Sequence, residues 1–216
     1  MTNSDIKKLK SGTDVRGVAS PLLGRKVTLT CEAVELIARA FCTWLADKTG
    51  KDTLKIALGN DSRITAAELV AAFERGAERS GAQVFYTGLS STPSMFMILQ
   101  DRARGYDGSV MITASHLPAD RNGLKFFTPE GGLEGGDVDE ILNIAAKGDF
   151  LNGSGSVHED YFMDEYSAQL ADRVRSACGC ERPLEGKKVI VDAGNGAGGF
   201  FTDKVLKPLG ADTEGS

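Results

Sequence analysis

Short apolar runs alternate with segments of helical periodicity through the first half of the chain. Apolar runs predict strands at 55–58, 83–86 and 108–113. Apolar residues at helical spacing predict helices over 31–48, 64–79 and from Thr92-Pro93 onward. A helix between successive strands returns the chain to the same edge of a sheet. The sequence therefore predicts an α/β fold with a mixed, largely parallel sheet flanked by helices.

The composition excludes several classes of protein. Of 216 residues, 41% are hydrophobic and 25% charged, which is typical of a globular chain with a real core. The net charge of −5 argues against a nucleic-acid groove. Because no apolar run approaches ~20 residues and no secretory signal is visible, we predict a cytoplasmic protein without a membrane span. An organelle remains an alternative if a transit peptide has been removed.

Four cysteines, Cys31, Cys42, Cys178 and Cys180, are expected to be free thiols in a reducing compartment. The spacing Cys178-Gly-Cys180 is too tight for the usual zinc pairs, and no second pair supports it.

The candidate site begins where the strand at 108–113 ends. Ser115 and His116 follow in a turn that Pro118 interrupts, and a second apolar run at 124–127 brings Lys125 back towards it. A hydroxyl, an imidazole and an ammonium at one loop are typical of a functional site. An ordinary surface hairpin fits the local pattern equally well.

Two further segments place charged residues near this loop. Residues 11–18 are predicted to form a glycine-bracketed turn that aims Arg16 at an anion, since the planar guanidinium binds phosphate with two hydrogen bonds. A solvated arginine in an N-terminal loop is the alternative. Asp61, Ser62 and Arg63 follow the strand at 55–58. Ligands of α/β sheets bind beyond the carboxyl ends of strands, which favours a functional role for Ser115.

The remainder of the chain suggests a second unit. A helix is predicted at 138–146, with Asp137 as its N-cap rather than a metal ligand with Asp139. The segment 148–155 looks like a linker, which divides the chain into domains 1–155 and 156–216. A helix over 159–177 follows, with His158 as a surface or capping residue.

A strand at 188–192, a glycine loop and a helix at 200–209 end the chain. The loop matches G-x-G-x-x-G from Gly194 to Gly199, so a dinucleotide site and a structural or phosphate-facing turn both remain open. The strand has few partners. Apolar surface at 189–191 and 200–201 is therefore expected to be exposed and to favour self-association.

Four motifs in order resemble one family, the α-D-phosphohexomutases. Thr113-Ala-Ser-His-Leu-Pro118 resembles their T-A-S-H-N-P signature, with Leu117 in place of the usual Asn. The other three segments resemble the N-terminal arginine loop, the G-x-D-x-R element and the opening of the second domain: Ser11-Gly-Thr-Asp-Val-Arg-Gly17, Gly59-Asn-Asp-Ser-Arg63 and Val191-Asp-Ala-Gly-Asn-Gly-Ala-Gly198.

The resemblance implies an intramolecular phosphotransferase of carbohydrate metabolism, of the phosphoglucomutase or phosphomannomutase type. Ser115 would be the phosphoserine, and His116 would move a proton or hydrogen-bond the phosphate. Arg16, Lys125 and Arg63 would bind phosphate. Mg²⁺ would bind an oxygen of the phosphoserine, the substrate would be a hexose phosphate, and a hexose 1,6-bisphosphate would be the activator.

Family members have four domains, and their D-G-D-G-D-R magnesium loop, sugar loop and phosphate loop lie beyond the first. None of these motifs occurs in residues 1–216. We therefore expect domain I and the first strand–helix unit of domain II, with doubtful activity as a separate chain. The alternatives are a non-catalytic phosphosugar-binding or interaction module, and a dinucleotide-dependent oxidoreductase. The sequence does not name the sugar.

Overall fold

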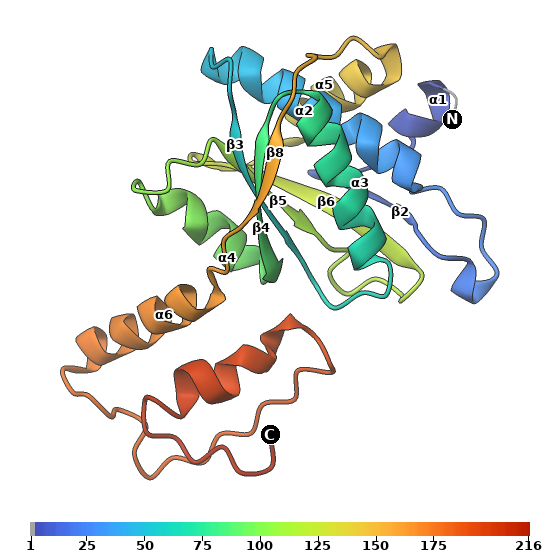
Figure 1. Ribbon diagram of the computed structural model, residues 1–216. Helices are drawn as coiled ribbons and strands as arrows, with labels where there is room; N and C mark the ends of the chain where they lie inside the picture. The colour runs from blue at the N-terminus through green and yellow to red at the C-terminus, as the bar shows by residue number, and fades with distance from the viewer. Residues whose placement is uncertain (1–2) are drawn as a thin grey trace.

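Figure 1 shows a computed structural model of the protein, which describes residues 3–216. In that range one eight-stranded sheet has the order β1-β2-β6-β5-β3-β4-β8, with β7 paired to β6. The strands are β1 (Lys10–Ser11), β2 (Asp14–Val18), β3 (Lys55–Asn60), β4 (Gln83–Leu89), β5 (Gly108–Ile112), β6 (Arg121–Thr128), β7 (Gly131–Gly132) and β8 (Ser156–Glu159). The α-helices are α1 (Asn3–Lys7), α2 (Cys31–Thr49), α3 (Ala66–Arg79), α4 (Thr92–Met97), α5 (Gly135–Lys147) and α6 (Met163–Cys178).

The sheet is mixed, and the predicted α/β fold is confirmed. The pairs β5–β3, β3–β4 and β4–β8 are parallel, whereas the pairs β1–β2, β2–β6, β6–β7 and β5–β6 are antiparallel. β5 and β6 form an antiparallel pair in which Met111 lies opposite Lys125. This pairing returns the chain from the loop after β5 along the neighbouring strand.

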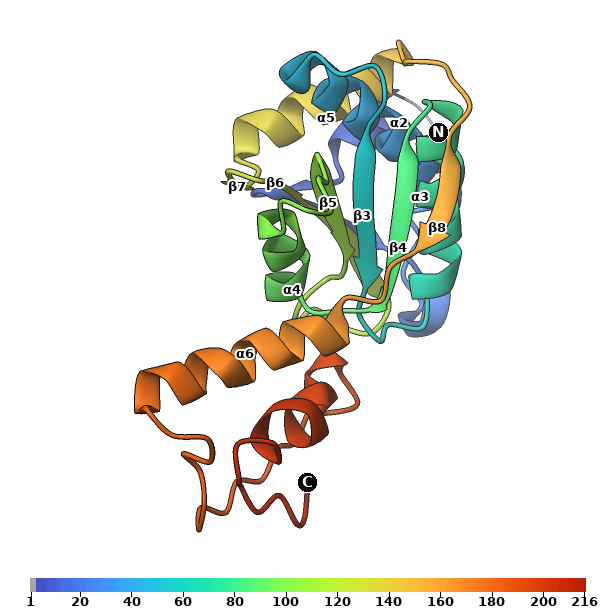
Figure 2. The same cartoon turned by 60° about the vertical axis from the view of Figure 1, so that its left-hand side comes forward.

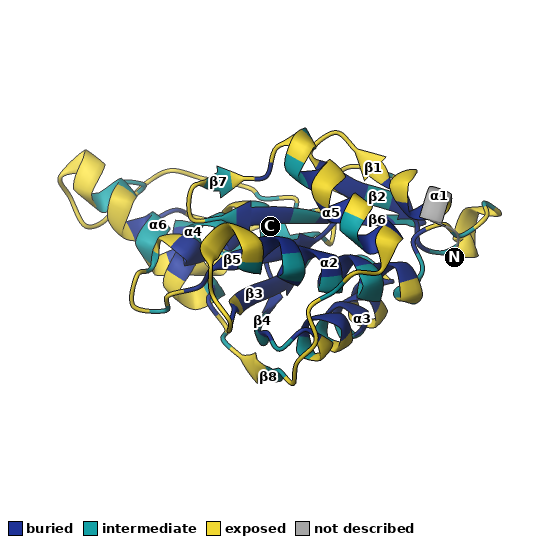
Figure 3. Cartoon of the chain, turned by 90° about the horizontal axis from the view of Figure 1, so that it is seen from above, coloured by how far each residue is buried: buried dark blue, intermediate teal, exposed yellow. Residues whose placement is uncertain are grey.

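Helices cover both faces of the sheet. α2, α3 and α5 pack on one face over a core that includes Phe41, Phe73 and Phe126. α4 and the 3-10 turn Ile98–Gln100 lie on the opposite face, where Met95 of α4 packs in one cluster with Met111 and Phe127. Figure 2 shows α4 and α3 on opposite sides of the strands. In Figure 3 the central strands are buried, while β8 at the edge is largely exposed.

The predicted helix at 31–48 is confirmed, and its ends follow from its sequence. Thr30 Oγ1 accepts a hydrogen bond from the N–H of Ala33, and Gly50 ends the helix in the left-handed conformation. The N-cap prediction for Asp137 is wrong. Glu134 is the N-cap of α5, and Asp137 lies in the first turn, where its carboxylate accepts from the Glu134 N–H.

The predicted glycine-bracketed turn at 11–18 is also wrong, because Asp14–Val18 is strand β2. Its backbone pairs with β1 on one side and β6 on the other. Val15 is fully buried between these two strands. The glycines at either end of the segment favoured a turn in the sequence, so the strand was not predicted. Arg16 therefore projects from a strand within the sheet rather than from a flexible loop.

The region predicted as a helix from residue 159 begins as a strand. β8 pairs in parallel with β4, and α6 starts only at Met163. His158 lies in β8, where its ring stacks on Phe85 with centroids 5.0 Å apart. The linker prediction places the domain boundary just before β8, yet β8 hydrogen-bonds to the first sheet.

The predicted strand at 188–192 does not form. One bridge, Lys188 to Asp212, is the extent of its pairing within residues 3–216. The helix predicted at 200–209 is reduced to a π-helical segment, Thr202–Leu206, after a 3-10 turn at Ala197–Gly199. Without a neighbouring strand, residues 188–209 have no sheet to pack on. Ile190 and Phe201 are 62% and 39% exposed, which confirms the expected exposure of apolar side chains in this segment.

The glycine loop 194–199 consequently lacks the preceding strand that a dinucleotide site requires, and this finding removes the support for that alternative. Across residues 3–216 no helix is long and apolar enough to cross a membrane.

Candidate active-site loop

Ser115 lies in a loop directly beyond the carboxyl end of β5. Its backbone has a φ of 55°, in the left-handed region that residues other than glycine rarely adopt. Such a conformation costs on the order of 1 kcal/mol or more and persists where the surroundings fix it. The side chain is exposed, so the serine hydroxyl is presented to solvent on a defined backbone.

Thr113 and Asp61 fix that backbone. Thr113 Oγ1 donates to Asp61 Oδ2 at 2.6 Å and accepts from the Ser115 N–H at 2.9 Å. β3 and β5 are parallel neighbours, so residues that follow their carboxyl ends meet here. The aspartate of the G-x-D-x-R element thus positions the serine backbone through one threonine hydroxyl.

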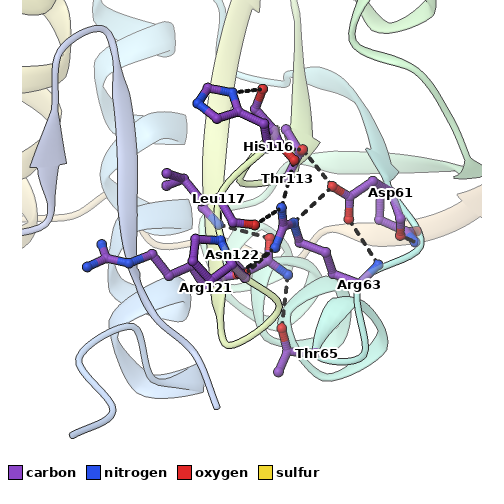
Figure 4. A network of polar contacts seen from close by, with 12 residues as sticks. Asp61, Arg63, Thr65, Thr113, His116, Leu117, Arg121 and Asn122 are labelled. Carbon is purple, nitrogen blue, oxygen red and sulfur yellow. Dashed lines mark hydrogen bonds and ion pairs between the residues drawn. The ribbon is translucent and has the colours of Figure 1, made fainter. Parts of the chain in front are cut away.

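Arg63 holds the rest of the loop (Figure 4). Its Nε donates to Asp61 Oδ2 at 3.3 Å. Its two terminal nitrogens donate to four backbone carbonyls at 2.7–2.9 Å, those of Ser115, Leu117, Pro118 and Arg121. All five guanidinium donors therefore have acceptors within the protein.

This arrangement bears on two features of the sequence. In this conformation Arg63 has no N–H left for a phosphate, so its predicted phosphate contact stays a prediction that requires the loop to rearrange. Leu117, which replaces the usual Asn of the signature, contributes its carbonyl to Arg63 at 2.8 Å. Because this contact uses the backbone, the substitution leaves the contact intact.

Arg16 and Lys125 are brought together by a shared carboxylate. Asp14 Oδ1 accepts from Lys125 Nζ at 2.5 Å, and Asp14 Oδ2 accepts from Arg16 Nη2 at 2.7 Å. The Asp14 side chain is only 6% exposed, whereas Arg16 and Lys125 are 20% and 28% exposed. The cluster has one cationic charge more than it has anionic charge, and both cations reach solvent.

Gly123 makes room for Arg16. It lies opposite Arg16 in the antiparallel pairing of β2 and β6. A Cβ at this position would lie 2.9 Å from Arg16 Cγ and 2.3 Å from the carbonyl oxygen of Val15. The carbonyl of Gly123 accepts a hydrogen bond from the N–H of Thr113 at 3.0 Å. Arg16 in β2, Gly123 in β6 and Thr113 just after β5 therefore form one row, two residues from Ser115.

His116 lies beside the serine hydroxyl. Its Nδ1 is 3.3 Å from Ser115 Oγ, a long hydrogen bond whose direction depends on the tautomer. Both side chains are exposed. The imidazole is therefore within reach of the serine proton, and within residues 3–216 no second hydrogen bond fixes it.

A cavity of about 610 Å³ adjoins this cluster. Four cations line it, Lys8, Arg16, Lys26 and Arg121, together with the acidic residues Asp5 and Glu32. Arg16 Nε is buried and has no hydrogen-bond acceptor among the described residues. A cationic excess around an unsatisfied guanidinium N–H is suited to a phosphate or another anion.

No group of three or more His, Cys, Asp or Glu side chains that could hold a metal ion occurs in residues 3–216. The sequence predicts Ser115, His116, Arg16, Lys125 and Arg63 as site residues, but it did not indicate the hydrogen bonds of Thr113 or the pairing of Asp14 with two cations. The position of Asp14 two residues before Arg16 would have indicated it, because such residues share one face of a strand.

The comparisons with known proteins agree with this geometry. Residues 8–152 match the family model for phosphoglucomutase/phosphomannomutase, alpha/beta/alpha domain I. The chain belongs to the phosphoglucomutase/phosphomannomutase family. It is 35% identical over 199 residues to a phosphoglucomutase of Neisseria meningitidis serogroup B, covering 91% of this chain and 39% of that protein.

Two other comparisons extend the likeness. A phosphoglucosamine mutase of Caldicellulosiruptor saccharolyticus is 31% identical over 210 residues, covering 93% of this chain and 43% of the relative. A crystal structure of a phosphoglucomutase/phosphomannomutase family protein from Burkholderia thailandensis superimposes with a TM-score of 0.79 at 26% identity, covering 99% of this chain and 44% of that one. The chain thus spans about two fifths of the length of the curated relatives it matches.

Proposed function

We propose that this chain is the phosphoryl-accepting part of an intramolecular phosphotransferase that acts on hexose phosphates, and that Ser115 takes up and returns the phosphoryl group. The observation that carries the proposal is the exposed hydroxyl of Ser115, whose left-handed backbone is held by Asp61, Thr113 and Arg63. Family membership supports the reaction class. The left-handed φ of a serine at the end of a sheet strand supports its role.

The transfer would replace one phosphorus–oxygen bond by another. Ser115 Oγ attacks phosphorus and loses its proton, the sugar oxygen leaves and takes up a proton, and the reverse step returns the group to a different hydroxyl. His116 Nδ1, 3.3 Å from Ser115 Oγ, would accept the serine proton. Phosphoryl transfer depends mainly on positioning and on positive charge around the moving oxygens. Arg16 and Lys125, which share Asp14, would supply that charge.

Mg²⁺ belongs to the proposal as a partner of the phosphorylated serine, because hard cations prefer phosphate and carboxylate oxygens. A hexose 1,6-bisphosphate would be both the phosphoryl donor and the intermediate that turns over.

The test is phosphorylation of the folded chain by glucose 1,6-bisphosphate with Mg²⁺, followed by intact-mass measurement and phosphopeptide mapping. We expect one phosphoryl group, located on Ser115 and absent from Ser115→Ala. Ser62→Ala is the matched control, since Ser62 is an exposed serine at the end of the neighbouring strand. A folded sample without phosphate on Ser115, or with phosphate on another residue, would contradict the proposal.

A second candidate function is phosphosugar binding without transfer. The cationic cavity beside Arg16 favours it, because it offers anion binding separate from the serine hydroxyl. Calorimetric binding of a hexose phosphate that is abolished by Arg16→Met, together with no phosphorylation of Ser115, would select this candidate over the first.

A further inference from the structure

The end of α6 presents two thiols that the proposed reaction does not use. Cys178 is the last residue of the helix, Gly179 is its C-cap, and Cys180 follows. Both cysteines are free and exposed. They lie at the junction between α6 and the C-terminal segment, where the chain leaves the helix (Figure 1).

Gly179 sets the spacing of the two thiols. Its φ of 67° and ψ of 23° place it in the left-handed helical region. That conformation mirrors the right-handed helix, so the flanking Cα atoms are separated as residues i and i+2 of a helix are. Helix radius, rise and turn angle give about 5.4 Å. Disulfides span Cα separations of roughly 4.4–6.8 Å, with the commonest values near 5.5–6 Å.

Hydrogen bonds hold this turn. The N–H of Gly179 donates to the carbonyl of Arg175 at 2.8 Å. The Arg175 guanidinium donates to the carbonyls of Glu181 and Pro208, each at 3.2 Å. The backbone on both sides of the cysteine pair is thus tied to the same arginine, which stabilises the turn that joins the two cysteines.

We propose that Cys178 and Cys180 form a reversible dithiol–disulfide pair that exchanges with small disulfides of the glutathione type. One cysteine thiolate attacks the disulfide of oxidised glutathione, forming a mixed disulfide and releasing one reduced glutathione. The second cysteine attacks the mixed disulfide, forms the Sγ–Sγ bond and releases the other. The protein loses two electrons and two protons, and one oxidised glutathione becomes two reduced molecules.

The pair is suited to reversible exchange rather than to permanent cross-linking. A disulfide that closes so short a loop removes little entropy from the unfolded chain. Exposed or strained disulfides are the more easily reduced ones. In its oxidised form the bond would fix the last turn of α6 and the start of the C-terminal segment, and reduction would release both.

The other two cysteines provide an internal contrast. Cys42 is fully buried, and burial raises the pKa of its thiol to about 12. Burial also raises the pKa of Cys31, whose Sγ donates to the Glu68 carbonyl at 3.8 Å. Because Cys42 is buried and Cys31 is half-buried, access to a small disulfide favours exchange at the exposed pair.

The test is incubation of the folded chain in graded mixtures of oxidised and reduced glutathione, followed by acid quenching, alkylation and peptide mapping. We expect the peptide containing residues 178–180 to lose two hydrogen atoms and to regain them with dithiothreitol. Cys178→Ser and Cys180→Ser should each acquire one glutathione instead. Cys31→Ser should behave as the unmodified chain does.

Gly179→Ala tests the geometry itself. A side chain disfavours the left-handed conformation, so the ratio of cross-linked to reduced pair should fall roughly tenfold at a fixed glutathione ratio. Two outcomes would overturn the proposal: a wild-type peptide that carries two glutathiones, or one that stays reduced at a ratio that fully converts Cys178→Ser to its mixed disulfide.

Discussion

Replacement of Arg63 by lysine tests whether one guanidinium holds the serine loop in place. Arg63 donates to Asp61 and to four carbonyls of residues 115–121, and its side chain is only 11% exposed. Lysine keeps the charge and much of the length. It has one nitrogen, however, and cannot reach acceptors that are arranged around a planar fork.

The expected loss can be worked from the four carbonyl contacts. Two acceptors, on Leu117 and Arg121, are in part-buried contacts, and two, on Ser115 and Pro118, are exposed. A hydrogen bond from a charged donor contributes about 1.5 kcal/mol where water is partly excluded, and an exposed one contributes about 0.5 kcal/mol. The sum is about 4 kcal/mol. If lysine restores one contact, Arg63→Lys should destabilise the protein by about 3 kcal/mol and lower Tm by roughly 10 °C.

The assay combines urea unfolding, followed by circular dichroism, with the rate of Ser115 phosphorylation by glucose 1,6-bisphosphate. We expect lower stability and a phosphorylation rate reduced at least tenfold at a temperature where the variant is folded. Arg102→Lys is the matched control, because Arg102 is an exposed arginine outside the site. Arg63→Lys with unchanged unfolding and unchanged phosphorylation would refute the role we assign to these hydrogen bonds.

Three further predictions follow from other contacts. Gly123→Ala should cost about 3 kcal/mol by overpacking against Val15 and Arg16, whereas Gly136→Ala, in open space on α5, should be neutral or stabilising; equal urea midpoints would contradict this. Burial opposes ionisation of Asp160, but hydrogen bonds from Arg104 and Tyr106 outweigh it and lower the pKa of Asp160. The ionised Asp160 therefore stabilises the fold above the unfolded-state pKa of about 3.9, and this contribution is lost as pH falls through the lower folded-state pKa. Asp160→Asn should consequently flatten the dependence of unfolding free energy on pH below about pH 4. An unchanged dependence from pH 5 to pH 3 would refute this. In hydrogen exchange, residues 187–210 should be less protected than residues 55–115 because Ile190 and Phe201 are exposed, and equal protection in a proven monomer would contradict the expectation.

The elements with strong local patterns were predictable because their local and tertiary preferences agree. The helix at Cys31–Thr49 has a threonine N-cap, an apolar face and a glycine C-cap in the sequence, and each has its expected role in the structure. The strands β3, β4 and β5 are apolar runs bounded by turn residues. Such elements need little information beyond their own residues.

The errors fall where pairing decides the structure. β2 was hidden by glycines at both ends, and only its two neighbouring strands make it a strand. The apolar run at 188–192 has the composition of a strand. It has almost no partner among the described residues, and backbone groups without a partner strand gain little from extended structure.

The candidate site divides in the same way. By itself the sequence determined the serine, the histidine, the cations and their order along the chain, because residue type and motif spacing are properties of the sequence. Only the tertiary structure decided that Asp61 and Thr113 fix the serine backbone. It also decided that Arg63 donates its hydrogen bonds to the serine loop. Asp14 pairs with both Arg16 and Lys125 for the same reason. These contacts join residues up to 111 positions apart, so strand order and register had to be known before they could be seen.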